Sequence, residues 1–304
     1  MTNDRPMLGI TLMTGFCILA PLGDSIAKLL GGEIPLSELL IVRFTMQVLL
    51  LVPVVWWFKY RLTMTKRIFY LVLIRTILHI IGIGGMFSAL RFLPLADTIA
   101  IAFVMPLIML ILGHYVLKEE VGARRIIASA IGFVGTLLVV QPSFEAVGLP
   151  ALLPLLVAVV FALFMLVTRQ IAKEIEPIAL QVVSGIQAVI ILCLIFPFTI
   201  GLGIETIGFK IPSAFDGLLL FTLGVIGTLA HLLMTWALRF APSATLAPMQ
   251  YLEIPFATLI GWFIFKDLPN GLAALGILIT IAAGLYIIWR ERMVTNNSAN
   301  RKVS

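Results

Sequence analysis

Charged residues are scarce in this 304-residue chain. Only 12% of its residues are Asp, Glu, Lys or Arg, whereas 61% are hydrophobic, and the mean hydropathy is +1.12. A soluble domain carries roughly 25% charged residues, so a water-soluble fold would lack the polar surface needed to cover so large an apolar core. The composition therefore predicts an integral membrane protein.

Cysteine and histidine are also rare, with two and three residues. Cys17 and Cys193 lie inside apolar runs, where a small buried side chain is the expected role, and they imply no disulfide framework or zinc site. His79, His114 and His231 lack the spacing of metal ligands. No glycine-rich phosphate loop for ATP is visible either, so we expect no metal and no cofactor.

Ten apolar segments are long enough to cross a bilayer, which takes about 20 residues at 1.5 Å per residue. They lie near 7–30, 35–58, 68–90, 95–117, 124–141, 149–169, 178–200, 216–238, 243–265 and 271–290. The first is too long for the apolar core of a signal peptide and lacks a small-residue cleavage site, so we expect it to be the first span. The predicted fold class is an all-α integral membrane protein with ten transmembrane helices.

The two halves of the chain repeat each other at an offset of 148 residues. Residues 89–94 read ALRFLP and residues 237–242 read ALRFAP. The same offset pairs Gly113 with Gly261, Lys118 with Lys266, and Glu119 with Asp267. This similarity predicts an internal duplication, the usual architecture of secondary transporters.

Each copy contains five spans, and an odd number makes the second copy enter the membrane from the opposite side. We therefore predict two inverted five-helix repeats, 7–141 and 148–290, followed by a basic cytoplasmic tail, 291–304. Inverted repeats are related by a pseudo-two-fold axis in the membrane plane, and substrate sites lie near the midplane where the repeats meet.

Lys and Arg are distributed unevenly between the loops. With the N-terminus in the cytoplasm, 15 of them fall in cytoplasmic segments and 4 in outer segments. Because the cytoplasmic side carries the excess, we expect both termini to be cytoplasmic. The net charge of +6 is then a determinant of topology, and we expect no nucleic-acid partner.

Several motifs resemble a known family. The segment 87–98, FSALRFLPLADT, and the GFVG of residues 132–135 are similar to the EamA-type drug/metabolite transporter superfamily. The resemblance covers both halves and implies a transporter of small organic metabolites. The ninth-span motif APMQYLE, residues 247–253, resembles the branch with S-adenosylmethionine uptake carriers, and LAPLGD, residues 19–24, resembles bacterial riboflavin uptake carriers. Both branches stay open.

Glu253 is the most informative polar residue, because it lies near the centre of the ninth span. A charge inside a span is costly and indicates function by default. Gln250 and Tyr251 lie within one turn of it, and the equivalent of Glu253 in the first repeat is Met105. A one-sided carboxylate suits a substrate contact or a proton carrier, and a structural Glu bonded to a neighbouring helix is the alternative. The predicted binding or coupling residues are Glu253, Tyr251, Gln250, Phe103, Trp236 and Gln187.

Other intramembrane polar residues have structural interpretations. Asp24 and Arg43 lie at matching depths in the first two spans, which predicts a structural ion pair. Arg75 lies about two turns into the third span, and we expect it to extend to the lipid headgroups. Gln181, Ser184 and Gln187 form a stripe at helical spacing in the seventh span, which predicts an interior face.

Prolines fall inside two corresponding spans. Pro106 lies in the fourth span, and Pro248 and Pro255 lie in the ninth. Mid-helix prolines break or bend helices, and interrupted helices at corresponding positions of two repeats indicate the binding site.

The predicted function is secondary transport of a small organic metabolite across the bacterial inner membrane. Riboflavin uptake comes first, because a flat heteroaromatic ring would stack on aromatic side chains and bond Gln250 and Glu253. S-adenosylmethionine, amino-acid-type metabolites and export are alternatives. The expected partners are the substrate and the lipid bilayer, and a homodimer is compatible with the sequence.

Two other classes are disfavoured. An integral-membrane enzyme would need a catalytic cluster, but the only acidic pair, Glu119-Glu120, lies in a basic loop. A channel would need rings of charge or a filter loop, and the sequence shows neither.

Overall fold

The computed structural model describes residues 5–119, 122–199 and 208–300. Nearly all of them are helical, and no strand occurs in these ranges. The first half comprises α1 (Pro6–Leu30), α2 (Leu36–Phe58), α3 (Lys66–Ala89), α4 (Leu95–Ala102), α5 (Met105–Tyr115) and α6 (Ala123–Val147). The second half comprises η1 (Leu149–Leu152), α7 (Leu153–Ile171), α8 (Pro177–Thr199), α9 (Ala214–Phe240), α10 (Ser243–Leu246), η3 (Ala247–Leu252), α11 (Glu253–Phe265) and α12 (Gly271–Asn300).

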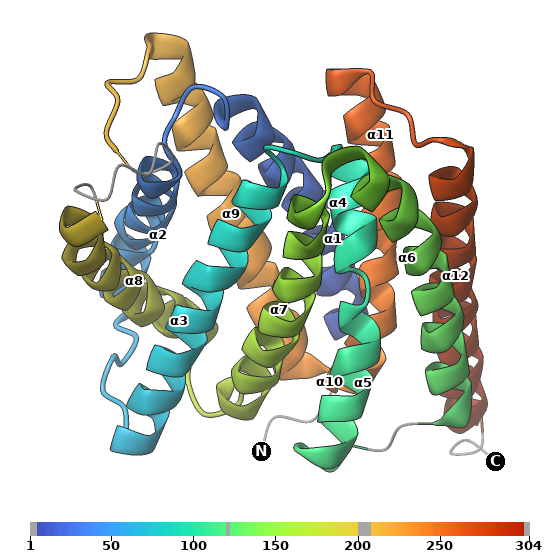
Figure 1. Cartoon of the computed structure of the whole chain (residues 1–304). Helices are drawn as coiled ribbons and strands as arrows, with labels where there is room; N and C mark the ends of the chain where they lie inside the picture. Colours follow the sequence, from blue (N-terminus) through green and yellow to red (C-terminus); the bar gives the residue numbers. More distant parts are fainter. Residues whose placement is uncertain (1–4, 120–121, 200–207, 301–304) are drawn as a thin grey trace.

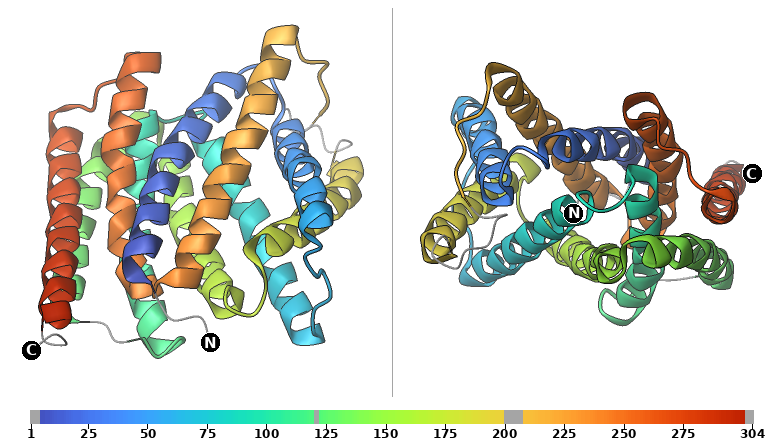
Figure 2. Two further views of the ribbon diagram at one scale, coloured as in Figure 1. Left: turned by 180° about the vertical axis from the view of Figure 1, so that it is seen from behind. Right: turned by 45° about the horizontal axis from the view of Figure 1, so that its top comes forward.

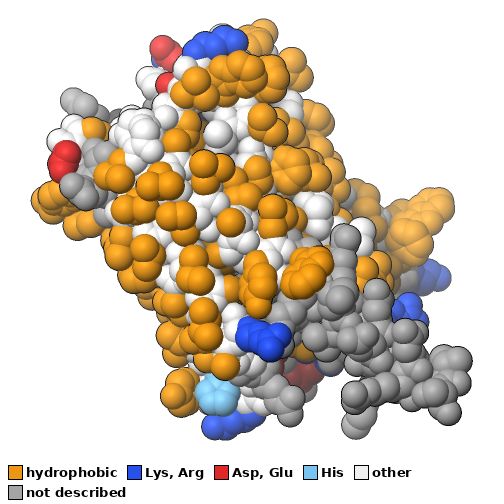
Figure 3. All heavy atoms as spheres, turned by 90° about the vertical axis from the view of Figure 1, so that its right-hand side faces the viewer, with side chains coloured by type: hydrophobic (Ala, Val, Ile, Leu, Met, Phe, Trp, Pro, Cys, Tyr) orange, Lys and Arg blue, Asp and Glu red, His pale blue; other side chains and the backbone are white. Residues whose placement is uncertain are grey.

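The predicted class, an all-helical membrane protein, is confirmed. In the described ranges, eight helical segments are long and apolar enough to cross a membrane. The shorter apolar helix Gly271–Tyr286 and the interrupted segment α10–η3–α11 complete ten spans. Figure 3 shows the expected surface, with hydrophobic side chains over the middle of the molecule and charged side chains toward its two ends.

Three boundaries differ from the sequence-based expectation. The predicted fifth span ends at residue 141, but α6 continues to Val147. The predicted tail, 291–304, begins as a continuation of α12 to Asn300, and residues 301–304 lie outside the described chain. The ninth span is a chain of three short helices rather than one.

Helix packing follows the duplication. The helices with the most extensive contacts are α1 with α9, α3 with α7, α2 with α8, and α6 with α12. Under the 148-residue offset α1 corresponds to α7 and α3 to α9, so the first two contacts are equivalent to each other. The other two join helices that are each other's equivalents. In Figure 2, α2 and α8 lie at one edge of the bundle and α6 and α12 at the other, as an inverted repeat requires.

The ends of the bundle are defined here by the path of the chain. Pro6 begins α1 at the lower end in Figure 1, and we call this the near side; Leu30 ends α1 at the opposite, far side. Local signals fix several helix ends. The side chain of Thr65 accepts a hydrogen bond from the N–H of Ile68 at the start of α3, and Lys59 ends α2 in the left-handed conformation.

Candidate functional site

A cavity of about 80 Å³ lies inside the bundle, between helices of both repeats. Its walls are mostly apolar and include four phenylalanines, Phe16, Phe87, Phe103 and Phe161. Its polar groups are Asp24, Arg43, His231 and Glu253. The cavity is smaller than the roughly 300–1,000 Å³ of typical ligand pockets, so an organic substrate requires the surrounding helices to separate.

Both interrupted spans meet at this cavity. In the first repeat the chain breaks between α4 and α5 at Phe103 and Val104, and α5 begins at Met105. In the second repeat α11 begins at Glu253, which is the equivalent of Met105 at an offset of 148 residues. Met105 and Glu253 both line the cavity. The corresponding helix starts of the two repeats therefore meet at this cavity.

The prolines explain the interruptions. A proline lacks the N–H that a helix interior needs, but it fits the first turn of a helix. Pro106 is the second residue of α5, and Pro255 is the third residue of α11. They therefore lie where a new helix starts, and the predicted link between prolines and broken spans is confirmed by the helix boundaries.

Glu253 is buried, with 8% of its surface exposed. Within the described chain its Oε1 atom has no hydrogen-bond partner. It lies in the first turn of α11, where the helix dipole favours a negative charge. A buried carboxylate oxygen without a partner is unusual, and this residue lines the cavity.

Arg43 faces the same cavity but is fixed by neutral groups. Its guanidinium donates to Gln47 Oε1 at 3.1 Å and to the carbonyl oxygen of Gly227 at 2.8 Å, and it lies 3.1 Å from His231 Nδ1. Among the described residues no ion pair joins Asp24 to Arg43, although both side chains line the cavity. The predicted direct ion pair is therefore wrong: both side chains line the cavity, but Arg43 binds neutral groups instead of Asp24.

The other predicted site residues divide into two groups. Phe103 lines the cavity, and the ring of Tyr251 lies behind it at a centroid distance of 5.4 Å. The buried Gln250 donates to Met165 Sδ at 2.8 Å. Gln187 accepts from Thr76 Oγ1 at 2.9 Å. These last two bind neighbouring helices and are absent from the described cavity wall.

Trp236 lies away from the cavity. It packs beside Leu51, Val182 and Leu232 in a cluster between α2, α8 and α9. Its position on α9 explains this, because Trp236 does not fall on the helix face that carries Gly227 and His231 into the cavity. Trp236 was predicted as a site residue because it is aromatic, but the direction of its side chain depends on how α9 packs.

The expectation for Arg75 is wrong. Its side chain is fully buried instead of reaching the headgroups. It donates to Thr168 Oγ1 at 2.9 Å and to Ser184 Oγ at 3.0 Å, with longer bonds to Gln181 and Thr235. Hydroxyl and amide groups on three surrounding helices satisfy the guanidinium, so it has no need of water. The polar stripe predicted on the seventh span supplies two of these acceptors, and it faces the interior as expected.

Two features of the cavity carry no signal in the sequence. The ring centroids of His231 and His79 are 4.4 Å apart, and His231 forms part of the cavity wall. The phenylalanines of α1 and α7 are ordinary residues of an apolar span, and only tertiary packing distinguishes them. In the described chain, no group of three His, Cys, Asp or Glu side chains is placed to hold a metal ion.

Ten helical spans in two inverted halves, with a charged cavity where the halves meet, define a multi-pass membrane transporter. The chain belongs to the EamA-like transporter family, whose sequence model matches residues 7–141 and 148–290. The family lies within the drug/metabolite transporter superfamily.

Relatives of known name cover most of the chain. An S-adenosylmethionine uptake transporter of Rickettsia prowazekii is 25% identical over 288 residues, covering 93% of this chain and 95% of that protein. A riboflavin transporter of Vibrio cholerae is 25% identical over 302 residues and covers 98% of each chain. A riboflavin transporter of Rhizobium johnstonii is 28% identical over 219 residues, covering 72% of this chain and 70% of that protein.

The fold also matches a solved crystal structure. That structure superposes with a TM-score of 0.67 at 16% sequence identity, covering 95% of this chain and 98% of the other. At this identity the likeness concerns the fold alone.

Proposed function

We propose that this protein is a secondary transporter that carries a small organic metabolite across the bacterial inner membrane. The observation that supports this most directly is the meeting of two interrupted spans at Met105 and Glu253 on one cavity wall. Discontinuous helices at the interface of inverted repeats are a recurring design of substrate sites in secondary transporters. Transport then proceeds by exposing the cavity to one side and then to the other.

The charges of the cavity favour S-adenosylmethionine as the substrate. Asp24, Arg43 and Glu253 present both signs of charge to a small enclosed space, and such groups are expensive inside a membrane unless they are used. S-adenosylmethionine carries a sulfonium, an ammonium and a carboxylate, so it offers a partner to each sign. The Rickettsia relative named for its uptake is similar over 93% of this chain.

Riboflavin, favoured from the sequence alone, is the second candidate. The four phenylalanines of the cavity wall would stack on its flat ring system, and the Vibrio relative is named a riboflavin transporter. Riboflavin is uncharged, however, and it would offer no ionic partner to the carboxylates of Asp24 and Glu253. We therefore place S-adenosylmethionine first.

Reconstitution into liposomes tests the proposal. We expect saturable uptake of labelled S-adenosylmethionine that unlabelled compound suppresses, and weaker uptake of labelled riboflavin. Imposing a pH gradient distinguishes proton coupling from downhill flux. The variant Glu33→Gln serves as a control for loss of an acid, because Glu33 is exposed and bonds Lys210 on the far side. Absence of saturable uptake of either compound would overturn the assignment of substrate.

A further inference from the structure

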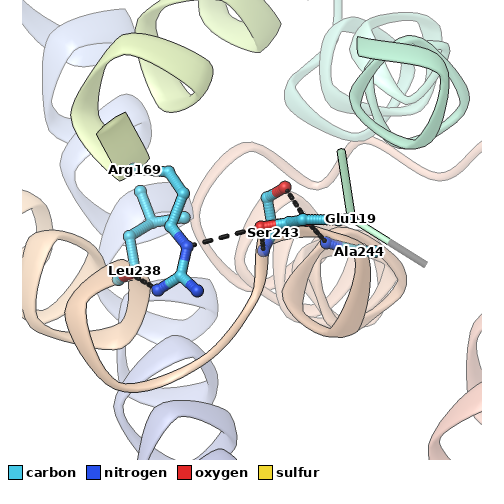
Figure 4. A network of polar contacts seen from close by, with 5 residues as sticks. All are labelled: Glu119, Arg169, Leu238, Ser243 and Ala244. Atoms are coloured by element: carbon cyan, nitrogen blue, oxygen red, sulfur yellow. Dashed lines mark hydrogen bonds and ion pairs between the residues drawn. The ribbon is translucent and has the colours of Figure 1, made fainter. Parts of the chain in front are cut away.

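A network of polar contacts closes the near side of the bundle. The Glu119 carboxylate accepts hydrogen bonds from Ser243 Oγ at 2.6 Å, from the Ser243 N–H at 3.2 Å and from the Ala244 N–H at 3.0 Å. It also pairs with Arg169 Nε at 3.4 Å, and Arg169 Nη1 donates to the Leu238 carbonyl oxygen at 2.6 Å. Figure 4 shows these five residues, which we call the near latch. The latch joins Glu119 of the first repeat to three helices of the second.

A simpler contact lies on the far side. Lys28 Nζ pairs with Asp267 Oδ2 at 3.3 Å and donates to the Leu93 carbonyl oxygen at 3.0 Å. We call these three residues the far latch. It joins α1 of the first repeat to the turn that follows α11 of the second.

The acidic residues of the two latches are equivalent under the internal duplication. Glu119 and Asp267 are 148 residues apart, and each follows a lysine in the left-handed conformation, Lys118 at φ 56° and Lys266 at φ 60°. The backbone N–H of Glu119 donates to the carbonyl oxygen of Gly113. The backbone N–H of Asp267 donates to the carbonyl oxygen of Gly261, which is the residue equivalent to Gly113.

The basic partners occupy similar places in their helices, although Lys28 and Arg169 are 141 rather than 148 residues apart. Lys28 is in the last turn of α1, and Arg169 is in the last turn of α7, which begins the second repeat. In both latches the cation also binds a carbonyl group at the end of the third span or just beyond it. The same design therefore occurs once on each side of the membrane.

The latches differ in how far they are closed. Side chains of the near latch are nearly enclosed, with Arg169 11% and Glu119 13% exposed, whereas Asp267 in the far latch is 41% exposed. Glu119 binds the first N–H groups of α10. Leu95 and Ala96, which begin α4, occupy the equivalent positions, but within the described chain their N–H groups make no bond to Asp267.

We infer that the two latches are alternating gates of the cavity, and that opening one completes the other. In the state that faces the near side, Glu119 releases Arg169 and the start of α10, while Asp267 comes to accept the N–H groups of Leu95 and Ala96. The inference rests on the proposed carrier function. Its physical basis is that a nearly enclosed ion pair cannot lose one partner while it stays buried, so the near latch is either closed or hydrated. Asp267 of the far latch is already 41% exposed, and two packings of the same helices result.

Cysteine accessibility in purified protein tests the inference. In a background without Cys17 and Cys193, single reporters are placed at Leu246 in α10 and at Thr98 in α4, which are equivalent positions with fully buried side chains. The rate of reaction with a hydrophilic thiol reagent is then measured at each reporter in detergent. This measurement needs no substrate and no knowledge of the orientation in the cell.

We expect Glu119→Gln to raise the rate at the Leu246 reporter and to lower it at the Thr98 reporter. The expected rise is about tenfold, the factor that corresponds to about 1.4 kcal/mol. Asp267→Asn should shift the two rates in the opposite sense, and the double variant should return them toward the starting ratio. Ser243→Ala removes only one hydrogen bond of the near latch, so it should shift the two rates in the same sense as Glu119→Gln but more weakly. It replaces Glu119→Gln in the test if Glu119→Gln folds poorly.

Glu174→Gln is the matched control. It removes an ion pair to Arg67 of 2.9 Å on the same side of the bundle, but the two side chains are 62% and 41% exposed, so neither rate should change. Equal acceleration at both reporters by Glu119→Gln would indicate general loosening and would overturn the inference, as would unchanged rates. Opposed shifts in a protein that transports neither S-adenosylmethionine nor riboflavin would retain the gates and reject the assigned function.

Discussion

Thr280 Oγ1 lies 3.4 Å from the carbonyl oxygen of Gly132, a residue that precedes it by 148 positions. The two residues are therefore equivalents in the duplicated chain, and they contact each other between α6 and α12. Equivalent residues can meet only where the axis that relates the repeats passes close by. This contact places the pseudo-two-fold axis at one edge of the bundle, and the contact of α2 with α8 places it at the other.

Replacement of Glu253 tests its role in transport. Glu253→Met restores the residue of the first repeat, so the fold and membrane insertion should be retained. Transport should fall about tenfold or more, because a charged hydrogen-bonding group is lost from the cavity. Glu253→Gln separates the mechanisms: if the carboxylate carries protons, accumulation driven by a gradient disappears while exchange of substrate survives. Normal accumulation by both variants would leave only a structural role.

A second prediction concerns the two glycines of α9. The space beside Gly227 is occupied by the Arg43 guanidinium, and that beside Gly217 is open within 4 Å. Gly227→Ala should lower the free energy of unfolding by about 1–3 kcal/mol through overpacking. Gly217→Ala lies in the same helix and should be neutral or stabilising, since alanine favours helices. Thermal melting in detergent compares them, and similar melting temperatures would contradict the packing shown for Arg43.

Asp24 and Arg43 should interact, but weakly. Because Arg43 bonds Gln47, Gly227 and His231, Arg43→Ala removes more bonds than Asp24→Asn and should be the more damaging change. In a double-mutant cycle we expect a coupling energy of about 1–2 kcal/mol, as for charges separated by a cavity. A coupling of about 3–5 kcal/mol would instead require the direct buried pair.

The orientation in the membrane remains a prediction that labelling of cells can test. In a background without native cysteines, Leu268→Cys lies in an exposed far-side turn and Leu62→Cys in an exposed near-side segment. A membrane-impermeant thiol reagent should label Leu268→Cys in intact cells, and Leu62→Cys only after permeabilisation. The reverse pattern would place both chain ends outside.

The spans were predictable because hydrophobic length is a local property, and the inverted halves were predictable because the duplication is still visible in the sequence. Glu253 could also be identified from the sequence as a candidate site residue, because its repeat equivalent is apolar. The surroundings of Arg75 were not, because its acceptors Thr168, Ser184 and Thr235 come from three distant segments and only packing unites them. The direction of Trp236 depends in the same way on the rotation of α9 against its neighbours.

The contact between α6 and α12 has an evolutionary consequence. Helices that pack against their own equivalents would do the same if each half were a separate polypeptide, so a single five-span protein inserted in both orientations could assemble this bundle from two identical chains. Fusion of the two copies would then release each from the need to serve both orientations. A carboxylate at residue 253 opposite a methionine at residue 105 is a difference that two identical chains could not hold.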